Sequence, residues 1–342
     1  MSLLTVLFAI LLAGCARLQP GYYLTPENYP VQPAAAEQVQ IMPSAPPPTS
    51  TPISTIQTVD IGGAAETSTA VPAELPIPTA GTAPPACEET SGRMVFGSYP
   101  STLAGGEFRY RVHLPPCYEQ TGKRYPYLII MHGLVPGTDL MNDAQWDQMG
   151  LDEAADAGFR DGTLPPMIIV MPNGNDVNHG NDDSPFARLL VTELMPEIES
   201  KFCTWNTSAT RAIGGLSRGG FWAFSVAFLY PDLFDRVGGH SPFLYDGDYP
   251  VYNPYNLADD AQGIERLTMY IDHGAQDYVD VGVQGFIEKL NARGIEPIYV
   301  VNETGGHTED YWAAHTEDYL QFYAAEWPRD LSVYPDCQEP GR

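Results

Sequence analysis

A serine in a glycine-rich turn is the side chain of this 342-residue chain best suited to nucleophilic chemistry. Ser217 stands at the centre of Gly215-Leu216-Ser217-Arg218-Gly219, between a run that ends in β-formers and an apolar stretch with helical spacing, 221–230. On a sharp strand-to-helix turn the hydroxyl of such a serine is exposed, the backbone is strained, and larger neighbours two residues away would clash. A glycine-rich loop without chemistry is the alternative. With the partners found downstream, the pattern predicts the nucleophile of a serine hydrolase.

A serine hydroxyl needs a base to accept its proton. Among the seven histidines, His307 follows an expected strand at 297–301 and lies in the loop Thr304-Gly305-Gly306-His307. The carboxyl ends of strands are where ligands meet open α/β sheets. We therefore expect His307 to be the base.

The base in turn needs an acid that orients it. Asp272 and Asp277 both lie between Ser217 and His307, after or within an expected strand. Asp272 is still at the strand's end, where a structural hydrogen bond is expected, whereas Asp277 lies further out on the loop. Asp277 is the predicted acid, with Asp272 in reserve. The order serine, aspartate, histidine along the chain is that of α/β-hydrolases.

The elements that position these residues alternate between strands and helices. Residues 108–114 alternate in polarity and predict an antiparallel strand, whereas continuous apolar runs predict buried parallel strands. This alternation predicts an α/β-hydrolase fold, a mostly parallel twisted sheet with helices on both faces. The expected parallel strands are 127–131, 167–171, 211–213, 267–271 and 297–301, and the expected helices are 146–157, 188–201, 221–230 and 281–293.

The first 86 residues differ from the rest of the chain. Residues 1–15 carry a short apolar run that ends in Leu12-Ala13-Gly14-Cys15, which resembles a bacterial lipoprotein signal with Cys15 as the lipidated residue. Residues 16–86 hold 14 of the 32 prolines and show no apolar period, so we expect a disordered tether. The catalytic domain is then 87–342, held at the surface or in the periplasm of a bacterium by its lipid.

The net charge and the cysteine content indicate which binding partners, disulfides and metals to expect. A net charge of −26 disfavours nucleic acid and anionic membrane surfaces, so contact with a membrane is expected through the lipid anchor only. Four cysteines remain after Cys15, an even number that suggests two disulfides in an exported domain, and none has metal-ligand spacing. Stapling the ends of the domain favours Cys87–Cys337, and a shared edge of the sheet favours Cys117–Cys203. Neither a metal nor another cofactor is expected.

A series of short motifs runs along the chain from 93 to 328: Leu114-Pro115-Pro116-Cys117-Tyr118, Arg124-Tyr125-Pro126, Met131-His132-Gly133-Leu134, Met171-Pro172-Asn173-Gly174, Gly215 to Gly220, Gly274 to Asp277, Gly306-His307 and Tyr311-Trp312. Through them the chain resembles the esterase D group of α/β-hydrolases, which includes enterochelin esterase-like enzymes, feruloyl and acetylxylan esterases, S-formylglutathione hydrolases and mycolyltransferases. The resemblance covers nearly all of 93–328. It implies an oxyanion hole made by the backbone N–H groups of Leu134 and Arg218. Cys117 stands where the group usually has glycine, and Arg218 where methionine is common.

Three further side chains are candidates for binding substrate. His179 lies in a polar loop, 173–183, that should border the pocket, and Tyr245 lies in a tyrosine-rich segment, 243–255, that is suited to stacking on a sugar or an aryl group. Trp146 follows the oxyanion loop and would either wall the pocket or pack in the core.

Together these features predict a serine carboxylic ester hydrolase acting on polysaccharide-linked acetyl or feruloyl esters or on siderophore esters. The alternatives are an acyltransferase of the mycolyltransferase type, or a surface binding protein that kept the fold without turnover.

Overall fold

The computed structural model describes residues 87–134, 142–174, 184–247 and 251–337. All of these residues lie in Pro78–Arg342, the second of the two units into which the chain divides. The expected signal segment, Cys15, the tether and His179 lie outside the described residues.

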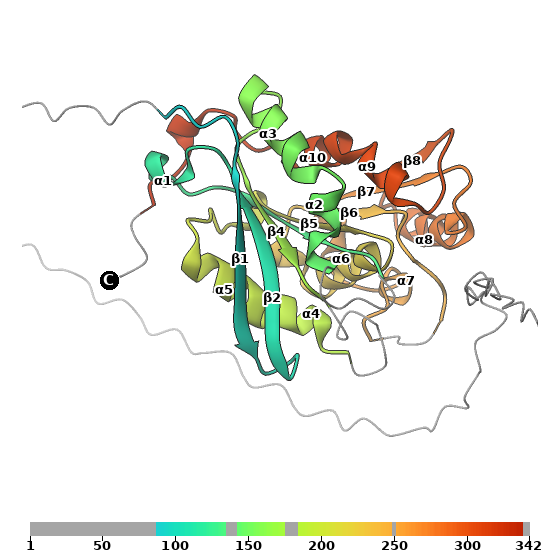
Figure 1. Ribbon diagram of the computed structural model, residues 1–342. Coiled ribbons are helices and arrows are strands. Elements are labelled where there is room, and N and C mark those ends of the chain that lie inside the picture. Colours follow the sequence, from blue (N-terminus) through green and yellow to red (C-terminus); the bar gives the residue numbers. More distant parts are fainter. Residues whose placement is uncertain (1–86, 135–141, 175–183, 248–250, 338–342) are drawn as a thin grey trace, which may run out of the picture. The chain divides into compact units, whose positions relative to one another are not determined.

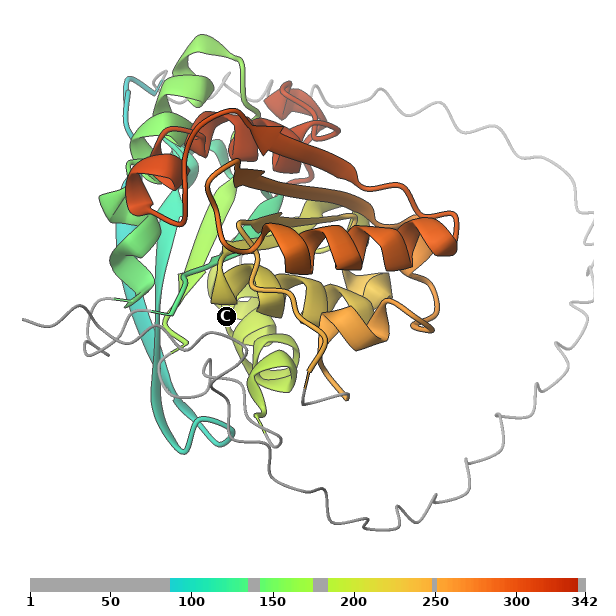
Figure 2. The same cartoon turned by 90° about the vertical axis from the view of Figure 1, so that its right-hand side faces the viewer.

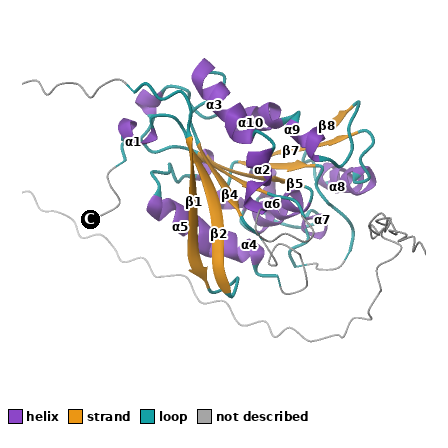
Figure 3. Cartoon of the chain, viewed as in Figure 1, coloured by secondary structure: helices purple, strands orange, loops and turns teal. Residues whose placement is uncertain are grey.

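Eight strands form one mixed sheet in the order β1-β2-β4-β3-β5-β6-β7-β8. β1 and β2 pair antiparallel, and β2 pairs antiparallel with β4, while every pairing from β4 to β8 is parallel. Figure 3 shows the strands in orange, with β1 and β2 in front. The candidate catalytic residues all follow carboxyl ends of parallel strands, so they meet at one edge of the sheet. The strands are β1 (Arg93–Ser101), β2 (Gly106–Leu114), β3 (Tyr127–Met131), β4 (Ile168–Pro172), β5 (Arg211–Leu216), β6 (Arg236–His240), β7 (Thr268–Gly274) and β8 (Ile298–Asn302).

Helices cover both faces of the sheet, as Figures 1 and 2 show. α4, α5, α6 and α8 pack over one face, on the apolar side chains that alternate along the strands, and α2, α3, α9 and α10 pack over the other. The predicted α/β-hydrolase fold is confirmed. The helices are α1 (Tyr118–Thr121), α2 (Gln145–Gln148), α3 (Leu151–Asp161), α4 (Phe186–Leu189), α5 (Met195–Lys201), α6 (Arg218–Leu229), α7 (Pro254–Leu257), α8 (Asp280–Ala292), α9 (Glu309–Ala313) and α10 (Thr316–Ala324), with a π-helical turn at Leu190–Leu194.

The central strands match their predicted ranges to within a few residues, and two of the predicted helices are interrupted. The helix expected at 146–157 breaks at Gly150, whose φ of 80° lies in the left-handed region that favours glycine. The helix expected at 188–201 contains the π turn. Two strands have no predicted range: β1, whose residues do not form an apolar run, and the central strand β6, whose sequence Arg-Val-Gly-Gly-His holds one large apolar residue. Across the described ranges, no helix combines the length and apolar character needed to cross a membrane.

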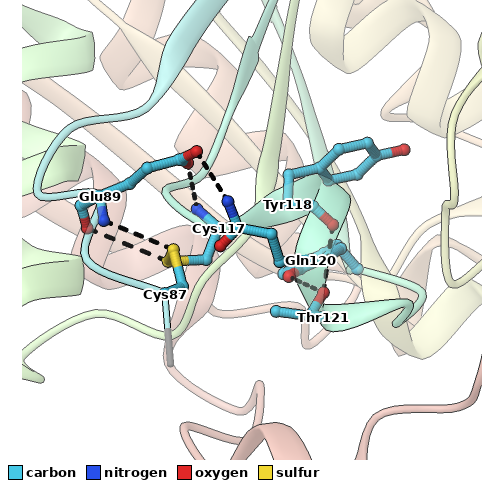
Figure 4. The surroundings of a disulfide bond; sticks show 7 residues. Cys87, Glu89, Cys117, Tyr118, Gln120 and Thr121 are labelled. Atoms are coloured by element: carbon cyan, nitrogen blue, oxygen red, sulfur yellow. Dashed lines mark hydrogen bonds between the residues drawn. A yellow bond between two sulfur atoms is a disulfide. The ribbon is translucent and has the colours of Figure 1, made fainter. Parts of the chain in front are cut away.

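Both disulfides differ from the predicted pairing. Cys87 bonds Cys117, and Cys203 bonds Cys337. The prediction paired Cys117 with Cys203 because both precede strands at the same edge of the sheet, and Cys87 with Cys337 because they bracket the domain. Both pairings are wrong. Glu89 explains the first bond, since its carboxylate accepts the N–H of Cys117 at 2.7 Å and so holds the amino-terminal segment against that residue (Figure 4).

The second disulfide follows from the path of the carboxyl-terminal segment. The N–H of Cys337 donates to the carbonyl of Gly122 at 2.7 Å, which places this segment beside the strand that leads into β3. On the other side of that strand, the N–H of Tyr125 donates to the carbonyl of Cys203 at 2.8 Å. Cys203 and Cys337 are therefore neighbours, although the pairing is not visible in their spacing along the chain.

Candidate active site

Ser217 lies on the tight turn between β5 and α6. Its φ of 50° and ψ of −115° form a conformation that residues other than glycine rarely adopt. The flanking glycines make this turn possible. A Cβ on Gly215 would lie 2.5 Å from the carbonyl carbon of Gly219, and a Cβ on Gly219 would lie 2.3 Å from the carbonyl oxygen of Met131. The structure thus explains both glycines of the motif and shows the strained turn expected of a nucleophile elbow.

His307 contacts the serine directly. Its Nε2 lies 2.8 Å from the Ser217 Oγ, as a base that accepts the hydroxyl proton requires. The ring lies between Tyr278, at 4.6 Å between centroids, and the edge of Trp312, at 5.0 Å. These two rings fix the plane of the imidazole. The loop that carries His307 lies close to the end of β7. Only glycine fits at position 274, because a Cβ there would come within 2.2 Å of the carbonyl oxygen of Gly305.

Asp277 completes the contact chain. Its carboxylate oxygens lie 3.1 and 3.2 Å from the His307 Nδ1. The side chain is buried, and it also accepts hydrogen bonds from the Val279 N–H and the Ser241 hydroxyl. Burial raises the pKa of the Asp277 carboxyl, but the hydrogen bonds from its three donors outweigh burial, so this pKa lies below its usual range. An ionised Asp277 holds His307 with the Nδ1 proton inward and Nε2 free for the serine.

Asp272, the reserve candidate for the acid, has a structural place instead. The carboxylate is fully buried and accepts hydrogen bonds from His240 Nδ1 at 2.8 Å, Tyr311 OH at 2.6 Å and Tyr319 OH at 3.0 Å. Burial lowers the pKa of His240 and outweighs the opposite effect of Asp272, so this imidazole is neutral. Its Nε2 accepts a hydrogen bond from the Tyr323 hydroxyl at 2.8 Å. Every oxygen of Asp272 is satisfied within this network, away from His307.

The loop after β3, called here the oxyanion loop because Leu134 is expected to contribute its N–H to an oxyanion hole, lies close to the elbow. His132 Nε2 accepts the N–H of Gly174 at 2.8 Å, so its Nδ1 carries the proton and donates to the carbonyl of Gly133 at 2.5 Å. The turn comes close to the elbow, since a Cβ on Gly133 would lie 3.5 Å from the Ser217 Cβ. Arg218 is the first residue of α6, so no preceding helical turn accepts its N–H.

Sequence reasoning missed a bridge between this loop and the histidine loop. Gln145, which is buried at the start of α2, accepts the N–H of Gly133 through Oε1 at 2.8 Å and donates from Nε2 to the Glu309 carboxylate at 3.0 Å. Glu309 opens α9, two residues after His307. The amide oxygen of Gln145 thus accepts one hydrogen bond and its nitrogen donates another. The side chain links the oxyanion loop to α9, the helix that follows His307. A glutamine in a helix carries no sequence signal for such a bridge.

We expect Gln145→Leu to lower kcat/KM for an ester by about 10- to 100-fold, because the oxyanion loop loses the acceptor that fixes its position. Steady-state kinetics together with a thermal melt make the measurement. Glu309→Gln is the matched control: its amide oxygen can still accept from Gln145, so its loss should be several-fold at most. A Gln145→Leu enzyme as active as the wild type would show that the bridge does not position the loop.

The three candidate substrate-binding residues have different outcomes. The expectation that Trp146 binds substrate is wrong: the side chain is 1% exposed, its Nε1 donates to the carbonyl of Met131 at 2.9 Å, and its ring packs edge-on against His240 and Tyr319 beneath the sheet edge. Tyr245 is half-buried, stacked on Phe221 one turn into α6. His179 lies outside the described part of the chain.

Among the described residues, one cluster has metal-ligating atoms close together, at Cys87, Glu89 and Cys117. Its two sulfurs are joined in a disulfide, so neither is a thiolate that could bind a metal.

An α/β-hydrolase sheet with a strained serine, a histidine and a buried aspartate in mutual contact defines the serine hydrolase class of active site. The Esterase family model, described as "Putative esterase", matches residues 101–326. The chain belongs to this family.

Curated proteins are also similar to this chain. A Xylanibacter ruminicola protein named "Endo-1,4-beta-xylanase/feruloyl esterase" is 28% identical over 222 residues, which are 61% of this chain and 28% of that protein. An esterase of Mycobacterium tuberculosis is 31% identical over 255 residues, which are 71% of this chain and 53% of that protein. The chain thus spans about a quarter to a half of the length of these relatives.

Solved structures share the fold. A ferulic acid esterase has a TM-score of 0.61 at 23% identity, covering 69% of this chain and 98% of that one. S-formylglutathione hydrolase from Staphylococcus aureus has a TM-score of 0.56 at 18% identity, covering 68% and 99%.

Proposed function

We propose that this protein is a serine carboxylic ester hydrolase that works through an acyl-enzyme. The observation that carries the proposal is the contact of His307 Nε2 with Ser217 Oγ at 2.8 Å, in line with the buried Asp277 on the other ring nitrogen. Membership of the Esterase family supports the same chemistry.

Acylation follows from this geometry. The Ser217 oxygen attacks the ester carbonyl carbon while His307 Nε2 takes the hydroxyl proton, and Asp277 stabilises the imidazolium that forms. The N–H groups of Arg218 and Leu134 are proposed to donate to the carbonyl oxygen as it becomes negative. When the tetrahedral intermediate collapses, the bond to the alkoxy oxygen breaks. The alcohol then leaves with the proton from His307.

Deacylation repeats the steps with water. His307 takes a proton from water as its oxygen attacks the acyl carbon, and the same N–H groups stabilise the second intermediate. Collapse releases the carboxylic acid, and the proton returns to the Ser217 oxygen. Ester and water are consumed and acid and alcohol are formed, with no cofactor.

The proposed substrates are acetyl or feruloyl esters of polysaccharides, or siderophore esters. The feruloyl and ferulic acid esterases among the similar proteins support the first of these. We place the catalytic domain, residues 87–342, outside the cytoplasm, held by a lipid on Cys15 through the tether at 16–86. The two disulfides support an oxidising compartment.

A panel of esters on the purified full chain tests this proposal. We expect hydrolysis of 4-nitrophenyl acetate, and among natural esters a preference for a feruloylated or acetylated oligosaccharide over a siderophore ester. Adding a sugar acceptor should leave the acid as the main product, whereas acyl transfer to that sugar would favour the transferase alternative. Binding of these esters without turnover would favour a non-catalytic protein.

We expect Asp277 to contribute no pH dependence to kcat/KM above about pH 5. Its pKa is lowered, so its carboxylate is charged at every pH above the usual aspartate value of about 3.9, and the charge that orients His307 is lost only as the pH falls below that value. A pH profile of kcat/KM on a neutral ester makes the measurement. Two rising limbs above pH 5 would contradict the assignment of Asp277 as the acid.

A further inference from the structure

Arg218 follows the proposed nucleophile directly in the chain, and its side chain lies close to two aromatic rings. Its guanidinium carbon is 5.3 Å from the ring centroid of Phe221 and 5.5 Å from that of Phe243. Phe243 itself contacts the elbow, since its N–H donates to the carbonyl oxygen of Ser217 at 3.0 Å. The guanidinium thus lies against two aromatic rings, and one of them belongs to a residue whose backbone is bonded to Ser217.

This cation has no anionic partner among the residues that the structure describes. Its Nη1 is buried and donates no hydrogen bond there. A buried donor without an acceptor is costly, more so when it is charged. By contrast, other arginines of the domain, such as Arg111 and Arg211, form ion pairs with aspartate or glutamate at 2.7 Å.

Position adds a second cost. Arg218 is the first residue of the twelve-residue helix α6, where the helix dipole disfavours a positive charge. Residues that destabilise the fold locally, as an unpaired cation at a helix N-terminus does, are found mainly at functional sites. An apolar side chain such as methionine would avoid both costs while leaving the backbone N–H of the oxyanion hole in place. What the arginine offers is a forked donor suited to a carboxylate.

We propose that Arg218 binds an anionic group of the substrate, most simply a carboxylate carried on the ester, and so selects charged esters over neutral ones. The proposal rests on the proposed esterase function and specifies its substrate class. The carboxylate can belong to the acyl half, as in a half-ester of a dicarboxylic acid, or to the alcohol half, as in a uronic acid or a hydroxybenzoate. Both place the same chemistry within reach of the guanidinium.

Two matched pairs of esters test the proposal on the full chain at pH 8. The acyl pair is 4-nitrophenyl adipate half-ester against its methyl ester, and the alcohol pair is 4-carboxyphenyl acetate against 4-carbamoylphenyl acetate. The measured quantity is the ratio of kcat/KM for the charged member to that for the neutral member. We expect this ratio to exceed one in one of the pairs, and that pair identifies the half that carries the carboxylate.

Substitution then assigns the preference to the side chain. In Arg218→Met the ratio should fall by about 10- to 100-fold, the loss of one charge-assisted hydrogen bond, whatever the absolute rates. Arg218→Lys should keep part of it, since the charge remains without the fork. A wild-type ratio of one or less in both pairs would overturn the proposal, and so would a ratio that survives in folded Arg218→Met. Failure of the wild type to hydrolyse even the neutral esters would instead overturn the esterase function.

Discussion

Ser217→Ala is expected to lower kcat for ester hydrolysis by about a million-fold while the domain stays folded. Loss of a triad member costs this much because the remaining groups have no nucleophile to activate. The Oγ contributes little to stability, since its contact is with His307 at the surface of the sheet edge rather than with the core. Assays with 4-nitrophenyl acetate over long reaction times measure kcat, and circular dichroism shows whether the domain is folded.

Ser225→Ala is the matched control. This serine lies in the same helix, α6, is fully buried, and its Oγ has no hydrogen-bond partner among the described residues. Its removal should leave activity close to that of the wild type. Near wild-type turnover in folded Ser217→Ala would rule out Ser217 as the nucleophile, whatever the result for Ser225→Ala.

Asp277→Asn is expected to lower kcat by a factor on the order of 10⁴ with the geometry preserved. The amide can donate to His307 Nδ1, which places the imidazole proton on Nε2, where it cannot accept from Ser217. Kinetics on a neutral ester measure the effect, and a thermal melt shows whether the buried side chain still packs.

Asp272→Asn is the control for Asp277→Asn, because it also replaces a buried carboxylate but one that does not contact His307. Asp272 accepts from His240, Tyr311 and Tyr319 inside the core, so its replacement should lower the free energy of unfolding by about 1–3 kcal/mol. The folded fraction should keep activity within several-fold of the wild type. If Asp272→Asn were the crippling change and Asp277→Asn the mild one, the acid would be misassigned while the serine and histidine assignments would stand.

Sequence reasoning reached the parts of the site that depend on local pattern. The glycines around Ser217 are dictated by backbone clashes within a few residues, and the buried strands are readable from continuous apolar runs. Asp277 and His307 follow the ends of β7 and β8, and parallel strands bring such ends together. Order along the chain was therefore enough to select the residues that the structure shows in contact.

Features that depend on packing between distant segments were not reachable in the same way. Gln145 and Glu309 are 164 residues apart and resemble ordinary helix residues. Trp146 could equally have faced a pocket or the core, and only its contacts with His240 and Tyr319 decide this. The disulfide pairing was wrong because four cysteines meet at one end of the sheet, and their partners depend on the paths of both terminal segments.

The most direct test of the central claim, that Ser217 forms the covalent intermediate, is mass spectrometry of the protein after reaction with a phosphonofluoridate probe. Such a probe phosphonylates an activated serine and releases fluoride, and its adduct cannot be hydrolysed as the acyl-enzyme is. We expect one adduct per chain, on the peptide that contains Ser217, with activity lost in proportion to labelling. Labelling should be absent from Ser217→Ala. An adduct on another residue that accounts for the lost activity, or full activity after complete labelling of Ser217, would contradict the account.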